Sequence, residues 1–176
     1  AEYLWAACGE SRTFTFALAE ASDKISIELA SGQYASLAST AIVYFDNIKV
    51  EEYNVDQPKS LFDFERTSDL DYVSVSGSSA EIIEKTDRQT LGHTDHVDTD
   101  AMSGKVLKVN KIGGGWNQGP VTTINLGRTV PAGTTVTLDV AVTIPTVSNC
   151  SKNYILIRVN NGTAQNLWVA CGESRT

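Results

Sequence analysis

Residues Thr135–Ile144 read TVTLDVAVTI. Valine, leucine and isoleucine occupy every second position from Val136 to Ile144, and mostly polar residues occupy the positions between them. Because successive side chains of a β-strand point to opposite faces, this alternation predicts a strand with one apolar face and one polar face.

The same period of two recurs along the chain, in residues 14–18, 25–29 and 154–160. Further candidate strands are 41–50, 61–65, 72–75, 80–84, 105–110 and 121–126. Turn-forming sequences such as Ser76-Gly77 and Pro131-Ala132-Gly133 separate them. No stretch repeats its apolar residues with a helical period for more than two turns. The pattern predicts an all-β fold, a β-sandwich (jelly roll) of two antiparallel sheets.

The composition of the chain excludes several classes of protein. Its 176 residues are enough for one all-β domain with a sizeable core. The net charge of -7 argues against a nucleic-acid partner, because phosphate binding needs clustered Lys and Arg. No apolar run is long enough to cross a membrane. Residues 1–13 lack the basic start and apolar stretch of a signal peptide, so we expect a mature or excised segment.

The three cysteines are Cys8, Cys150 and Cys171. Their spacing matches no zinc motif. Two interpretations stay open. One is a disulfide with one odd thiol, which an oxidising compartment would allow. The other is three small buried residues with free thiols.

One segment of the sequence is duplicated. Residues Leu4–Thr13 read LWAACGESRT and Leu167–Thr176 read LWVACGESRT, with Ala6 replaced by Val169. The second copy follows the first by 163 positions, about the length of a domain. We interpret the chain as one repeat length of a tandem array, beginning within one repeat and ending within the next. Residues 1–54 would be the back half of one repeat, 55–60 a polar linker, and 61–176 the front half of the next.

This duplication has a structural consequence. The two copies, 4–13 and 167–176, should compete for the same position in the sheet. One copy fills it and the other is left over. The single chain can still fold as a circular permutant, because the termini of such domains often lie close together. We expect the spare strand to offer a route to strand-swapped self-association.

Three motifs carry a family resemblance when residues 61–176 are read before residues 1–54. They are LFDFE at Leu61–Glu65, SGKVLKV at Ser103–Val109 and YFDNIKV at Tyr44–Val50. In this cyclic order the chain resembles the jelly-roll carbohydrate-binding modules of bacterial xylanases and glucanases, of the family 4, 9 and 22 type. The resemblance covers most of the chain, and it implies a secreted or cell-surface module that recognises a plant-type polysaccharide such as xylan or β-glucan.

The resemblance also implies a structural calcium ion between the first and last strands of the module. The matching carboxylates are Asp46 and Glu65. A backbone carbonyl near Ser103–Lys105 would be a third donor, and we name Lys105 as the residue that provides it. Calcium binds hard oxygen ligands of this kind. Both carboxylates lie among apolar residues, where an unpaired charge is costly. The alternative is that they point to solvent or pair with Lys or Arg.

A second acidic cluster lies in residues 91–104, LGHTDHVDTDAMSG. It contains His93, Asp95, His96, Asp98 and Asp100. The spacing does not match an EF-hand, which has glycine at the sixth loop position. We interpret this segment as a solvated acidic loop.

A sugar-binding face needs aromatic rings to stack on sugar rings, and planar polar groups to bond the hydroxyls. Trp116 lies among glycines and amides, which is a poor setting for a core residue. Strand alternation puts other candidates on an outward face. The predicted ligand-binding residues are Trp116, Asn117, Gln118, Tyr154, Arg158, Trp168, Trp5 and Glu28. Burial of Trp5 and Trp168 in the sandwich core remains an alternative.

Nothing in the sequence indicates catalysis. There is no GxSxG or HExxH motif and no phosphate-binding loop. The chain has two histidines, and no Cys–His pair suggests a nucleophile. Repetition favours binding, because linked weak sites gain avidity. We therefore expect a non-catalytic module. The alternative is a structural or adhesive repeat of a large surface protein that binds no sugar.

Overall fold

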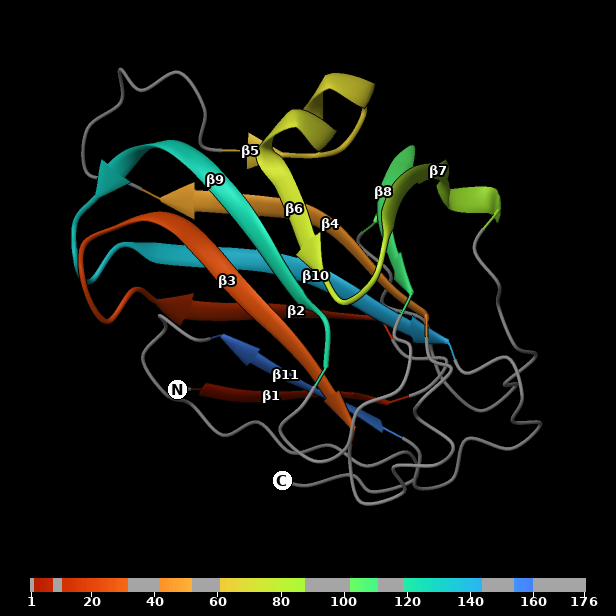
Figure 1. Cartoon of the computed structure of the whole chain (residues 1–176), viewed down its shortest axis with the longest axis horizontal. Coiled ribbons are helices and arrows are strands. Elements are labelled where there is room, and N and C mark those ends of the chain that lie inside the picture. Colours follow the sequence, from red (N-terminus) through yellow and green to blue (C-terminus); the bar gives the residue numbers. More distant parts are fainter. Residues whose placement is uncertain are drawn as a thin grey trace.

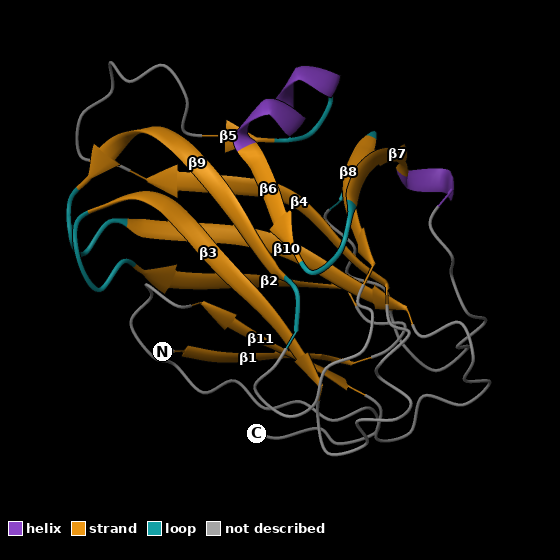
Figure 2. Cartoon of the chain, viewed as in Figure 1, coloured by secondary structure: helices purple, strands orange, loops and turns teal. Residues whose placement is uncertain are grey.

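The computed structural model describes residues 2–7, 11–31, 42–51, 61–87, 102–110, 119–143 and 154–159. Nearly all secondary structure in these ranges is β-strand, as Figure 2 shows. Two short 3₁₀ helices, η1 (Thr67–Tyr72) and η2 (Lys85–Asp87), are the exceptions.

The strands form two sheets whose neighbours are all antiparallel (Figure 1). The five-stranded sheet has the order β1 (Glu2–Ala7), β11 (Tyr154–Val159), β3 (Ser22–Ser31), β9 (Val121–Val130) and β6 (Val73–Ser76). The six-stranded sheet has the order β2 (Ser11–Ala17), β10 (Thr135–Thr143), β4 (Ile42–Glu51), β8 (Lys105–Asn110) and β7 (Ala80–Glu84). Its sixth strand, β5 (Leu61–Phe62), pairs with β4.

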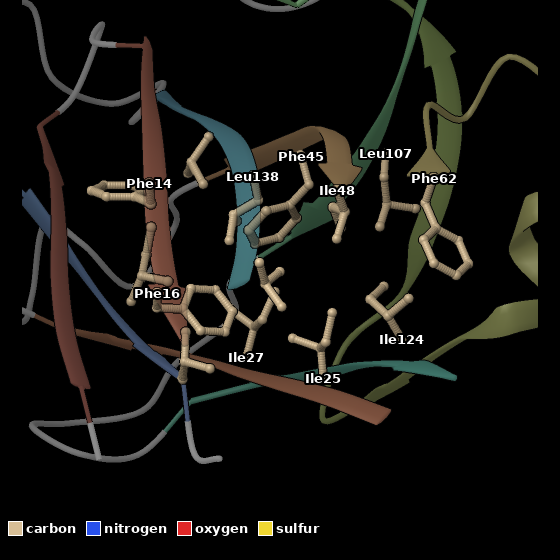
Figure 3. Packing of buried hydrophobic residues seen from close by; sticks show 14 of the residues in the cluster. Phe14, Phe16, Ile25, Ile27, Phe45, Ile48, Phe62, Leu107, Ile124 and Leu138 are labelled. Carbon is tan, nitrogen blue, oxygen red and sulfur yellow. The ribbon is translucent and has the colours of Figure 1, made fainter. Parts of the chain in front are cut away.

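The core lies between the two sheets. Figure 3 shows Phe45, Ile48 and Leu138 of one sheet and Ile25, Ile27 and Ile124 of the other pointing into the same space. All six are at most 1% exposed. Each fully buried side chain of this size contributes roughly 1.5–3 kcal/mol relative to its exposed state. The alternation of strand residues therefore produces a sandwich, because each sheet buries its apolar face against the other.

A β-bulge interrupts the pairing of β4 with β10. Thr137 pairs with Lys49 and Asp139 pairs with Asp46, so Leu138 lies opposite two residues of β4. One of the two, Asn47, has a φ of 47°. Asparagine is among the few residues that adopt this left-handed conformation readily, and such a residue is typical of one bulge type. The bulge keeps the flanking apolar residues of β4 in the core and leaves Asp46 on the opposite face.

A second, smaller apolar cluster lies on that opposite face of the six-stranded sheet. It consists of Ile42, Tyr44, Met102, Val106 and Ala141. The segment that carries Met102 is held by Lys85. The Lys85 amide donates to the Gly104 carbonyl at 2.7 Å, and the Lys85 Nζ donates to the Met102 carbonyl at 2.6 Å. This face is therefore covered in part and is not a bare sheet surface.

The predicted all-β sandwich is confirmed, with local differences in strand length. The strand expected over 61–65 ends at Phe62, and Phe64 has a φ of 55°, which is incompatible with an extended strand. The strand expected over 72–75 starts only at Val73, because Tyr72 closes helix η1. The boundary between tandem repeats at residues 55–60 lies outside the described residues and stays a prediction.

Candidate functional site

Two aspartates meet across the bulge of the six-stranded sheet. Asp46 on β4 and Asp139 on β10 are direct cross-strand partners, and they are 1% and 4% exposed. Like charges directly opposite each other destabilise a sheet. An arrangement of this kind needs specific compensation from its surroundings.

Hydrogen-bond donors provide part of that compensation at Asp46. Its Oδ1 accepts a hydrogen bond from the Asn47 backbone amide at 2.7 Å. Its Oδ2 accepts from the Ser103 backbone amide at 3.0 Å and from Asn47 Nδ2 at 3.3 Å. The Ser103 bond ties the segment before β8 to the bulge.

Asp139 is held by two side chains. Thr13 Oγ1 on β2 donates to Asp139 Oδ1 at 2.5 Å. Asn47 Nδ2 donates to Asp139 Oδ2 at 2.8 Å. The Asn47 amide therefore bridges both aspartates, and the bulge that gives Asn47 its unusual backbone conformation also places the bridge.

Glu65 approaches the same region from the chain after β5. The Lys105 backbone amide donates to Glu65 Oε1 at 3.0 Å. A Cβ atom at Gly104 would lie 1.9 Å from that oxygen, and Gly104 has a φ of 59°. The backbone conformation favours a glycine here, and any side chain at this position would displace the Glu65 carboxylate.

The electrostatics of the cluster raise the pKa of Asp46. Burial raises the pKa of the Asp46 carboxyl from 3.8 to about 6. The amide donors of Ser103 and Asn47 oppose this shift in pKa, and the negative charges of Asp139 and Glu65 add to it. Desolvation and like-charge repulsion both penalise the ionised form.

Two hydrogen bonds connect the residues of the predicted calcium site, one from the Ser103 amide to Asp46 and one from the Lys105 amide to Glu65. The predicted carbonyl donor near Ser103–Lys105 stays a prediction. Within the described ranges, no group of three or more His, Cys, Asp or Glu residues has the geometry to hold a metal ion. The donor chemistry nevertheless suits calcium. Because each carboxylate oxygen has two lone pairs, the hydrogen bonds leave acceptor capacity for a cation.

Three residues of this cluster were missed by sequence reasoning: Thr13, Asn47 and Asp139. For Asp139 the signal was present, as the acidic residue on the polar side of the alternating strand 135–144. What the sequence did not reveal is the register that sets Asp139 opposite Asp46. Asn47 was visible only as part of the motif YFDNIKV.

The predicted sugar-binding residues fall on the other sheet, where β11 lies between β1 and β3. Arg158 is the direct partner of Glu28, and Leu156 is the direct partner of Trp5. Ile157 and Val159 are buried in the core, so the alternating positions 154, 156 and 158 belong to the outer face of the sheet. The register thus puts Trp5, Tyr154, Arg158 and Glu28 on one face.

Glu28 is more enclosed than an outward strand position usually is. It is 9% exposed, and it has a polar interaction within the structure. The polar positions next to it on the same face, Ser26 of β3 and Thr123 of β9, are direct partners of each other. Both are partly exposed. Further along the face, Ser74 and Ser76 of β6 are exposed.

The remaining predicted site residues lie outside the described residues. They are Trp116, Asn117, Gln118 and Trp168. Residues 91–101 of the acidic loop, with His93, and the three cysteines lie outside them as well.

No family model, no curated protein and no solved structure matches the chain. Among the described residues, no helix is both long enough and apolar enough to span a membrane.

Proposed function

We propose that this domain is a non-catalytic carbohydrate-binding module that recognises a plant-type polysaccharide such as xylan or β-glucan. The observation that carries the proposal is the pairing of β1, β11 and β3. These neighbouring strands contribute Trp5, Tyr154, Arg158 and Glu28 to one outer face. Aromatic and planar polar residues in adjacent rows are what an extended glycan chain needs.

The outer face suits a neutral, hydroxylated ligand. Its described uncharged polar members are mainly Ser and Thr, together with Asn125 of β9, and its described charged members are Lys24, the direct partner of Asn125, and Glu28. Hydroxyl and amide groups exchange hydrogen bonds with sugar hydroxyls without requiring a charge on the ligand. The net charge of -7 on the whole chain disfavours acidic polymers as ligands.

The proposal includes a structural calcium ion at the carboxylate cluster of Asp46, Asp139 and Glu65. Its support is the repulsion that the buried Asp139 and the exposed Glu65 exert on the buried Asp46, for which the described residues provide neutral N–H and O–H donors. A bound cation would supply positive charge at the bulge. Asp46 and Glu65 would hold it, and Asp139 would add a further carboxylate.

Affinity electrophoresis in gels that contain soluble xylan, β-glucan or mannan tests the binding proposal. We expect retardation of the wild type in at least one gel. The double variant Trp5→Ala/Trp168→Ala removes the ring from both copies of the duplicated segment, and Trp116→Ala removes the ring from the glycine-rich segment. Each should lose at least tenfold in affinity while the melting temperature stays that of a folded domain.

A matched control is Tyr72→Leu. Tyr72 is 36% exposed but lies in η1 against Phe62, away from the proposed face. It should keep the wild-type mobility in every gel. A wild-type protein that no polysaccharide retards would contradict sugar binding and favour the structural or adhesive repeat.

A further inference from the structure

The position next to β11 at the edge of the five-stranded sheet is held by β1. The pairing is continuous, from Glu2 opposite Val159 to Ala7 opposite Tyr154. Figure 1 shows β1 outside β11, with β3 on the other side of β11. Because β11 already pairs with β3, it has one edge to offer and can accept only one more strand.

The duplicated segment fits this edge in the same register. Leu167–Ala170 reads LWVA where Leu4–Ala7 reads LWAA. Shifting the observed pairing of β1 by the 163-residue offset puts Leu167 opposite Ile157 and Trp168 opposite Leu156. The inward positions would again be apolar, and a tryptophan would again take the outward position beside Leu156.

The connection from β11 to the second copy has the sequence of a β-hairpin. In that register Val159 would be followed by residues 160–164, NNGTA, and by Gln165 as its partner. Loops of three to five residues that contain glycine are a recognised hairpin connection. Closing so short a loop costs less entropy than joining Ala7 to Tyr154, which lie far apart in the sequence.

We propose that residues 165–170 of this chain compete with β1 for the edge position beside β11. In the exchanged form, Glu2–Ala7 is released and the second copy completes the sheet. Strand β2 stays in place, because its core residues Phe14 and Phe16 have no counterpart in 167–176. This inference rests on the register and the duplication, and it does not depend on sugar binding.

Disulfide trapping in the full-length chain tests the exchange. The three native cysteines are first replaced by serine. Leu156→Cys combined with Trp168→Cys then reports the second copy, and Leu156→Cys combined with Trp5→Cys reports β1. Direct cross-strand partners lie within the Cα separation that a disulfide requires. We expect both pairs to form monomeric cross-links on mild oxidation, identified by mass spectrometry of the digested protein.

The matched control is Leu156→Cys combined with Val169→Cys, which is one position out of register and belongs to the opposite face. It should cross-link at least tenfold less than the pair with Trp168→Cys. Equal cross-linking of both pairs would overturn the proposal. So would cross-linking to position 5 alone. A cross-linked dimer through position 168 would overturn exchange within one chain and indicate exchange between two copies.

A pair of truncations provides a second measurement that needs no cysteine substitution. One variant starts at Ser11 and lacks β1; the other ends at Val159 and lacks the second copy. Each should melt within a few degrees of the full chain, because the other copy fills the edge. The double truncation should melt at a much lower temperature than the sum of the two single effects implies. If the decrease in melting temperature of the double truncation equals the sum of the two single decreases, the proposal is overturned.

Discussion

Asp46 is ionisable in a place where its charge is costly, since it is 1% exposed and faces Asp139 across the strand pair. The pKa of its carboxyl is raised to about 6, compared with ~3.9 in an unfolded chain. Between these values the folded state binds a proton that the unfolded state does not. The free energy of unfolding therefore falls as the pH rises from about 4 to about 6, and the loss persists above pH 6.

Comparing wild type with Asp46→Asn isolates this contribution. In urea unfolding with EDTA present, the wild type should lose up to about 3 kcal/mol relative to the variant between pH 4 and pH 7. The asparagine does not titrate, so its curve lacks this component. The control is Asp63→Asn, on the nearby segment after β5, whose pH dependence should follow the wild type. Parallel curves for wild type and Asp46→Asn would contradict a raised pKa.

The bulge in β4 depends on one residue, Asn47, which adopts a left-handed backbone conformation and also connects two strands through its side chain. Asn47 has a φ of 47°, and its side-chain amide reaches Asp46 and Asp139. Asn47→Gly keeps the backbone freedom and loses the amide. Asn47→Ala loses the amide and adds the strain of a side chain in the left-handed region.

We therefore expect both Asn47 variants to unfold more easily, with Asn47→Ala worse than Asn47→Gly by about 1 kcal/mol. Chemical denaturation at pH 7 measures the difference. The control is Asn125→Ala compared with Asn125→Gly, at an exposed position of β9 without a positive φ. There the order should reverse, because glycine weakens a regular strand. The same order at both sites would argue against a backbone role for Asn47.

The elements also indicate what the sequence can predict. The alternation in Thr135–Ile144 predicted β10 to within one residue, because the period of two is a local property. The strand 105–110 was predicted with its observed bounds. The early end of β5 was missed, since it depends on the φ of Phe64 and not on hydrophobicity.

The candidate site was predicted less completely, because part of it depends on non-local structure. The motifs YFDNIKV and LFDFE drew attention to Asp46 and Glu65, but Asp139 lies beside Asp46 through cross-strand register, which is set by the packing of the whole sheet. A one-residue slip of β10 would turn Asp139 toward the core. No local pattern around Asp139 distinguishes these two outcomes.

At the scale of the whole molecule, the carboxylate cluster joins parts of the chain that are remote in sequence. Thr13 comes from β2, Asp46 from β4, Glu65 from the segment after β5, and Asp139 from β10. The motifs that resemble the start and the end of a module thus meet at one place. A ligand at this junction would join residues of the sequence halves 1–54 and 61–176 within the six-stranded sheet.

If calcium binds there, it stabilises the folded state by mass action, because the unfolded chain has no such site. A hundredfold excess over the dissociation constant corresponds to about 2.7 kcal/mol. We expect millimolar Ca²⁺ to raise the melting temperature by several degrees and EDTA to lower it. Asp46→Asn/Asp139→Asn should abolish the response, whereas Glu20→Gln, an exposed carboxylate outside the cluster, should keep it. Mg²⁺ at the same concentration controls for ionic strength. A wild-type melting temperature that neither Ca²⁺ nor EDTA changes would mean that hydrogen bonds alone stabilise these buried carboxylates.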